Sequence, residues 1–144
     1  MRLIETAAQR FGPTITEGAL DPDLRVEDIF FASTVLGRAF RSSGKTKHIA
    51  LLTEFLESFT TLQSNNLWWH CKTAPYFWGR GNAFAALGLA EAITYLPINH
   101  PSRSKLIQTH LDILKVSQHT RINQGCGDKS LIDPRLISNT APLR

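Results

Sequence analysis

An aromatic stretch over residues 67–82 is the part of the chain whose residue types could bind a ligand. Its sequence, Leu-Trp-Trp-His-Cys-Lys-Thr-Ala-Pro-Tyr-Phe-Trp-Gly-Arg-Gly-Asn, holds all three tryptophans and one of the two tyrosines of the chain. The stretch has neither helical nor strand periodicity and is predicted to be a loop. Aromatic side chains on a connector usually line a cleft or cover a core. Arg80, just before a predicted helix, carries a guanidinium that can bind a carboxylate with two hydrogen bonds.

The polar residues of this region each have a structural alternative. His70 could be a core or surface histidine, although its two tryptophan neighbours favour a cleft. Arg80 could tie down the loop through backbone carbonyls, and Asn82 is expected to cap the next helix. Glu27 and Asp28 form an acidic pair near the start of another predicted helix, where the helix dipole alone favours negative charge.

Helices are predicted on both sides of the aromatic loop. Apolar residues at helical spacing indicate helices over residues 24–42 and 46–63, and then from Asn82 to just before Pro97 and over residues 102–119. A short helix over residues 3–11 is also possible, and no strand is predicted. Short turns join the helices in pairs, so the pairs are expected to be antiparallel. A two-helix repeat of about 50–55 residues is typical of an α/α toroid or solenoid.

Composition narrows the class of protein. The chain has 144 residues, enough for one domain, and its net charge of +4 weakly favours an anionic ligand. Arg38, Arg41, Lys45 and Lys47 cluster at a predicted helix end, which is typical of solvated charge rather than a nucleic-acid site.

The sequence also bears on localisation. No apolar run is long enough for a membrane span, and no secretory signal is recognised, so we expect a cytoplasmic protein. Cys71 and Cys126 are expected to be free thiols, without a zinc-binding spacing.

Four ordered stretches resemble one enzyme family. Residues 78–88, Trp-Gly-Arg-Gly-Asn-Ala-Phe-Ala-Ala-Leu-Gly, are similar to the W-x-R-G-N-x-W/F signature of the unsaturated glycuronyl hydrolases. These are the unsaturated rhamnogalacturonyl hydrolases of glycoside hydrolase family 105, related to family 88. Residues 26–32 resemble the family's W-x-D-D-x-F-M/F segment, residues 67–70 its G-L-x-x-H segment, and residues 96–101 its L-P-x-x-H-P turn.

The resemblance implies an all-α fold. The family fold is an (α/α)6 barrel (toroid) of twelve helices in antiparallel hairpins, and the four predicted helices would form part of it. We therefore expect a partial α/α-barrel glycosidase-like domain over residues 1–119 and a weakly structured tail over residues 120–144.

The resemblance also implies an activity. The enzymes hydrate the C4=C5 enol ether of unsaturated galacturonyl-rhamnose oligosaccharides derived from pectin, and they need no metal or cofactor. One carboxylic acid donates the proton, and aromatic faces stack on the sugar. The resemblance places this acid at Asp28 or Glu27. Glu27 corresponds better to the position of the family's catalytic aspartate when residues of the segment are counted. Asp28 is slightly preferred because it is also an aspartate. The residues expected to bind substrate are His70, Trp69, Trp78, Arg80 and Phe84.

Two other functions remain open. The chain could be a catalytically inactive fragment or pseudoenzyme that at most binds sugar or another protein chain. A helical interaction module of the TPR type is less favoured, because the helices lack that repeat pattern. A partial barrel leaves hydrophobic flanks uncovered, so we also expect self-association. No nucleic-acid or membrane partner is expected.

Overall fold

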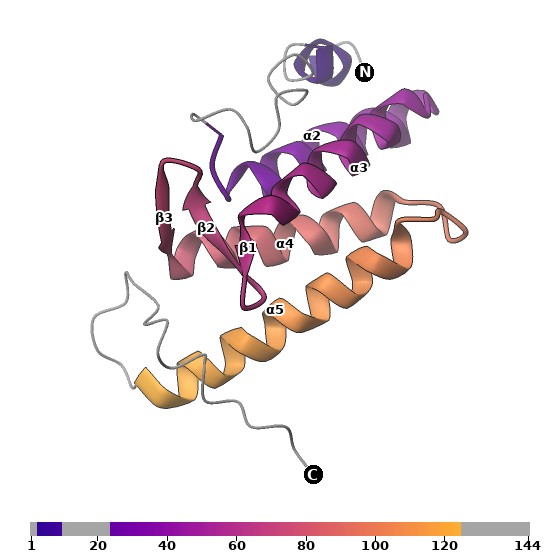
Figure 1. Ribbon diagram of the computed structural model, residues 1–144. Helices are drawn as coiled ribbons and strands as arrows, with labels where there is room; N and C mark the ends of the chain where they lie inside the picture. Colours follow the sequence, from indigo (N-terminus) through magenta and orange to yellow (C-terminus); the bar gives the residue numbers. More distant parts are fainter. Residues whose placement is uncertain (1–2, 10–23, 125–144) are drawn as a thin grey trace.

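The computed structural model describes residues 3–9 and 24–124 and shows helical hairpins with a small sheet at one end of the helices (Figure 1). Residues 3–9 form a short helix. The other elements, in chain order, are α2 (Asp28–Ser43), α3 (Lys47–Phe59), a 3-10 turn (Thr60–Leu62), β1 (Gln63–Ser64), β2 (Leu67–Cys71), β3 (Ala74–Phe77), α4 (Gly79–Tyr95) and α5 (Arg103–Gln124).

Helices α2 and α3 form the first hairpin, as their apolar spacing predicted. They run side by side in Figure 1 and contact each other along their length. Helix α2 ends at Gly44, whose φ of 69° lies in the left-handed region that favours glycine. The Gly44 amide donates a 2.7 Å hydrogen bond to the Phe40 carbonyl and closes the last turn.

The prediction that the chain has no strands is wrong. Strands β1, β2 and β3 form an antiparallel sheet in that order, with Gln63 opposite Trp68 and Trp69 opposite Phe77. Asn65 and Asn66 make the turn between β1 and β2 with φ angles of 52° and 61°, which two-residue hairpin turns require. The strands have two, five and four residues, too few to show a period of two in the sequence.

The second pair of helices follows the sheet. Helix α4 begins at Gly79 rather than Asn82, and its N-cap residue is Trp78. It packs mainly against α2, and α5 packs on α4. Helix α5 continues to Gln124, five residues beyond the predicted end at His119. Residues 125–144 lie outside the described residues, so the division of the chain after residue 119 stays a prediction.

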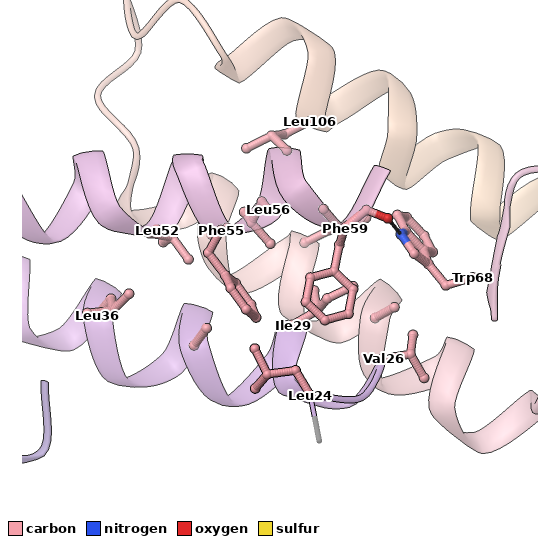
Figure 2. Packing of buried hydrophobic residues seen from close by; sticks show 14 of the residues in the cluster. Leu24, Val26, Ile29, Leu36, Leu52, Phe55, Leu56, Phe59, Trp68 and Leu106 are labelled. Atoms are coloured by element: carbon pink, nitrogen blue, oxygen red, sulfur yellow. Dashed lines mark hydrogen bonds between the residues drawn. The ribbon is translucent and has the colours of Figure 1, made fainter. Parts of the chain in front are cut away.

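A single hydrophobic core joins the helices to the sheet (Figure 2). Phe55 and Phe59 of α3 lie with ring centroids 4.9 Å apart and are fully buried. The indole nitrogen of Trp68 donates a 3.0 Å hydrogen bond to the Phe59 carbonyl, drawn as a dashed line in Figure 2. Trp68 thereby anchors β2 to the end of α3, which fixes the strand that carries His70.

The described residues supply helical hairpins and not a closed ring of twelve helices. Large apolar side chains remain exposed on three helices: Phe31, Leu87, Ile107, Leu111 and Leu114. Within the described ranges, none of the helices combines the length and hydrophobicity that crossing a bilayer requires.

Candidate active site

Glu27 and His70 form the centre of the candidate site. The main-chain amide of Val26 donates a 2.9 Å hydrogen bond to the His70 carbonyl, which ties the segment before α2 to β2. This bond brings Glu27 Oε2 to 3.8 Å from His70 Nε2. The two side chains are only 17% and 15% exposed, so the pair lies largely out of solvent. A carboxylate and an imidazole in such surroundings can exchange protons with a bound ligand.

One oxygen of this carboxylate has no hydrogen-bond partner among the residues that the structure describes. Glu27 Oε2 is buried without one there, whereas buried polar atoms are nearly always paired. Gly81 of α4 lies beside it: a Cβ added there would be 3.8 Å from Glu27 Oε2 and 2.5 Å from Val26 Cγ1. A larger residue at position 81 would push α4 away from the acid. The glycine therefore lets the start of α4 close one side of the site.

Aromatic rings form a wall beside the pair. The ring of Tyr76 stacks on His70 with centroids 5.3 Å apart and 22° between the planes. Trp78 meets the same imidazole edge-on, also at 5.3 Å. The guanidinium carbon of Arg80 lies 4.2 Å from the centroid of a Trp78 ring, in cation–π geometry. Three residues of the predicted site, His70, Trp78 and Arg80, are thus brought together with Glu27.

Asp28 has a different set of contacts. Its Oδ2 accepts a 2.7 Å hydrogen bond from the main-chain amide of Arg25 at the start of α2. A carboxylate in the first turn of a helix is stabilised by the helix dipole. Of the two acids, Glu27 is therefore the one that faces the histidine, and which of them is the acid of a reaction stays a prediction.

Phe84 and Trp69 lie next to the centre but contact other residues. The Phe84 ring packs on Phe30 and Phe31, with centroids 5.6 and 6.2 Å away. Phe84 lies one helical turn after Arg80 in α4. Phe31 of α2 likewise lies one turn after Glu27. The phenylalanine rings therefore lie on the same helix faces as Arg80 and Glu27. Trp69 is half-buried in β2 and packs against the hydrophobic core. Phe84 and Trp69 therefore lie near the Glu27–His70 pair, but these contacts are with other residues.

Two further residues contribute to the site in ways that the sequence does not predict. Tyr76 belongs to the aromatic stretch, and its contact with His70 depends on the β2–β3 hairpin. The prediction that Asn82 caps α4 is wrong, because the N-cap residue is Trp78. Asn82 is 2% exposed, and its side chain accepts from the Trp68 amide at 2.8 Å and donates to the Trp68 carbonyl at 2.9 Å and the Trp78 carbonyl at 3.1 Å. Asn82 therefore fastens β2 to the start of α4.

No metal centre is built into the described part of the chain. Across residues 3–9 and 24–124, no three His, Cys, Asp or Glu side chains gather closely enough to hold an ion. Glu27 and His70 lie 3.8 Å apart as a pair and not within a larger group of such side chains.

Several solved structures share this arrangement of helices. A glycosyl hydrolase of family 88 from Bacteroides vulgatus has a TM-score of 0.67 at 18% identity, over 76% of this chain and 36% of its own. A family 105 glycoside hydrolase from C. acetobutylicum has a TM-score of 0.65 at 18% identity, over 78% and 36%. A protein described as a polysaccharide lyase has a TM-score of 0.66 at 16% identity, over 79% and 36%. The fold is that of helical glycoside hydrolases.

The chain belongs to glycosyl hydrolase family 88, whose family model matches residues 27–140. The resemblance to family 105 and the related family 88 is therefore confirmed. The match begins at Glu27, the acid of the pair described above. The chain spans about a third (36%) of the length of the solved structures that it matches. A search of curated proteins gave no significant match.

Proposed function

We propose that the chain acts on oligosaccharides that end in an unsaturated uronic acid, with Glu27 as the acid that protonates the sugar. Membership of family 88 supports a glycoside hydrolase. The observation that carries the choice of residue is the buried Glu27 Oε2, which has no hydrogen-bond partner within residues 3–9 and 24–124 and faces His70 Nε2 at 3.8 Å. Asp28 Oδ2 instead accepts a hydrogen bond from the Arg25 amide.

The proposed reaction is a hydration. The substrate carries a C4=C5 double bond conjugated to its carboxylate, and the ring oxygen makes this bond an enol ether. The π electrons take the proton of Glu27 to form a C4–H bond, and the ring oxygen stabilises the positive charge left at C5. Water adds its oxygen to C5 and returns a proton to Glu27. The hemiketal formed opens and the neighbouring sugar leaves, so this route differs from displacement at the anomeric carbon by two carboxylates.

The other side chains supply binding. The faces of Tyr76 and Trp78 offer stacking surfaces for a sugar ring. Arg80 is exposed above Trp78, so its guanidinium can form charge-assisted hydrogen bonds with the carboxylate of a uronate. Galacturonyl-rhamnose oligosaccharides from pectin have both the carboxylate and the ring face that these groups suit.

A pair of variants tests the acid. Unsaturated oligosaccharides from a pectin-lyase digest are mixed with the purified chain, and the loss of absorbance from the conjugated alkene is followed. Glu27→Gln is nearly isosteric and should lower the rate by about a hundredfold or more, the usual contribution of general acid catalysis. Asp28→Asn, the matched control one residue away, should keep most of the activity. Loss of activity in Asp28→Asn with survival in Glu27→Gln would reassign the acid to Asp28.

A second candidate function is binding without turnover. The aromatic rings and Arg80 suffice to hold a uronate even if Glu27 transfers no proton. In that case the folded chain would bind the oligosaccharides in calorimetry, Arg80→Ala would weaken the binding, and the alkene absorbance would stay constant. Such a result would favour a sugar-binding pseudoenzyme over a hydrolase.

A further inference from the structure

Tyr76 contacts His70 on the nitrogen that faces away from the acid. The Tyr76 hydroxyl lies 3.1 Å from His70 Nδ1, and Nε2 is the nitrogen nearest Glu27. The two contacts occupy both nitrogens of one imidazole. We propose that Tyr76 is a positioning residue that selects the tautomer of His70 with the proton on Nε2. The functional consequence of this inference rests on the hydrolase proposed above, but the tautomer itself can be measured independently.

The hydroxyl favours this tautomer because of hydrogen-bond chemistry. In a neutral imidazole one nitrogen donates and the other accepts. A phenol hydroxyl both donates and accepts, but it is the stronger donor, so it preferentially donates to an unprotonated Nδ1 and leaves the ring proton on Nε2. The ring has little freedom to turn over, since Tyr76 stacks on its face and Trp78 meets it edge-on. The nitrogen that faces Tyr76 is therefore fixed.

Once Glu27 has given up its proton, its carboxylate disfavours the other tautomer. A proton on Nδ1 would then leave the lone pair of Nε2 directed toward a carboxylate oxygen 3.8 Å away, and the two electron-rich atoms would repel. With the proton on Nε2, the same approach is attractive. Tyr76 and Glu27 thus act in the same direction from opposite sides of the ring.

The selected tautomer determines what the histidine presents to the acid. The 3.8 Å separation is too long for a direct hydrogen bond between Nε2 and Oε2, and Oε2 is buried. The Nε2–H group therefore faces the Glu27 carboxylate in a charge–dipole contact.

Nuclear magnetic resonance on the intact chain tests the tautomer directly. Long-range proton–nitrogen spectra of the histidine rings distinguish a protonated from an unprotonated nitrogen, and the His70→Gln variant assigns the signals. At an alkaline pH where the ring is neutral, Nδ1 of His70 should be unprotonated and Nε2 protonated. Tyr76→Phe keeps the stacked ring and removes the hydroxyl, so the two nitrogen shifts should move toward each other. A proton on Nδ1 in the unaltered chain, or unchanged shifts in Tyr76→Phe, would overturn the proposal.

The second tyrosine provides the control. Tyr95→Phe removes the same hydroxyl at the far end of α4 and should leave the His70 signals unchanged. Tyr76 is 43% exposed, so Tyr76→Phe is expected to fold. In the alkene assay Tyr76→Phe should lower kcat by roughly fivefold, the value of one hydrogen bond, with little change in KM. If the chain were inactive but showed the expected nitrogen shifts, the proposed hydrolase activity would be contradicted and the tautomer proposal would stand.

Discussion

Gly88 of α4 lies directly against the main chain of Ile29 in α2. A Cβ added at Gly88 would be 2.7 Å from the carbonyl carbon and oxygen of Ile29 and 2.7 Å from the amide nitrogen of Phe30. Real side chains essentially never approach a backbone so closely. The contact sets the separation of the two helices whose first turns carry Glu27 and Gly81, so it also sets the width of the candidate site.

Gly88→Ala should therefore separate α2 from α4. We expect the free energy of unfolding to fall by about 3 kcal/mol, because the clash is with rigid backbone rather than a flexible side chain. Gly44→Ala is the control: nothing lies within 4 Å of its new Cβ, and only the positive φ is unfavourable. It should cost about 1 kcal/mol. Urea denaturation of both variants measures the difference, and equal losses would contradict the close approach.

Asn82→Ala should loosen the strand that carries His70. The change leaves the buried Trp68 amide and carbonyl without their side-chain partner, and each unsatisfied group costs about 1–3 kcal/mol. We expect a total loss of about 3 kcal/mol, with faster amide exchange at Trp68. Asn99→Ala, on the exposed turn after α4, should change stability by less than about 0.5 kcal/mol. Unchanged exchange at Trp68 in Asn82→Ala would contradict the role given to Asn82.

Acid should release the short helix at residues 3–9. The hydrogen bond from Lys45 lowers the pKa of Glu5, burial opposes it, and the charges of Lys45 and His48 lower the pKa further. A carboxyl with a lowered pKa stabilises the fold above its unfolded pKa, and this stabilisation is lost as the pH falls through the folded value. Amide protection of residues 3–9 should therefore decrease between roughly pH 5 and pH 2. Glu5→Gln should weaken that protection at neutral pH and remove its acid dependence; an unchanged pH profile would refute the ion pairs.

Self-association stays a prediction that sedimentation can test. Phe31 and Leu87 are 47% and 55% exposed, and the Phe31 ring packs on Phe84. Exposed apolar groups of this kind favour association. Replacing both by serine should shift the chain toward monomer at high concentration. Ile98→Ser, at an isolated turn residue that is 89% exposed, is the control. If the unaltered chain sediments as a monomer at high concentration, the prediction of self-association is wrong.

The helices could be predicted from the sequence because burial on one face imposes a period on their residues. Leu52, Phe55, Leu56 and Phe59 repeat at helical spacing, and all are buried in α3. The sheet could not be predicted, since its strands are too short to show alternating apolar and polar residues. Its position also depends on the hydrogen bonds that Trp68 makes with Phe59 and Asn82. The two adjacent asparagines at the turn were the available signal.

The candidate site was predictable only in part. Motif positions led to His70, Trp78 and Arg80, which the structure brings together. The choice between Glu27 and Asp28 could not be made from their order, because neighbouring residues at the first turn of a helix point in different directions. Two hydrogen bonds distinguish the acids. The bond from the Val26 amide to the His70 carbonyl brings Glu27 to the histidine, and the bond from the Arg25 amide holds the Asp28 carboxylate.

The β2–β3 hairpin carries His70 and Tyr76, and Trp78 follows it directly. One continuous segment of the chain therefore supplies the histidine, its phenol partner and the indole wall, while the opposite carboxylate comes from a separate helix start. On the proposed function, these residues of one segment would bind the sugar together. Replacing that segment while preserving the Val26–His70 backbone bond should then change sugar binding and leave Glu27, the proposed acid, in place.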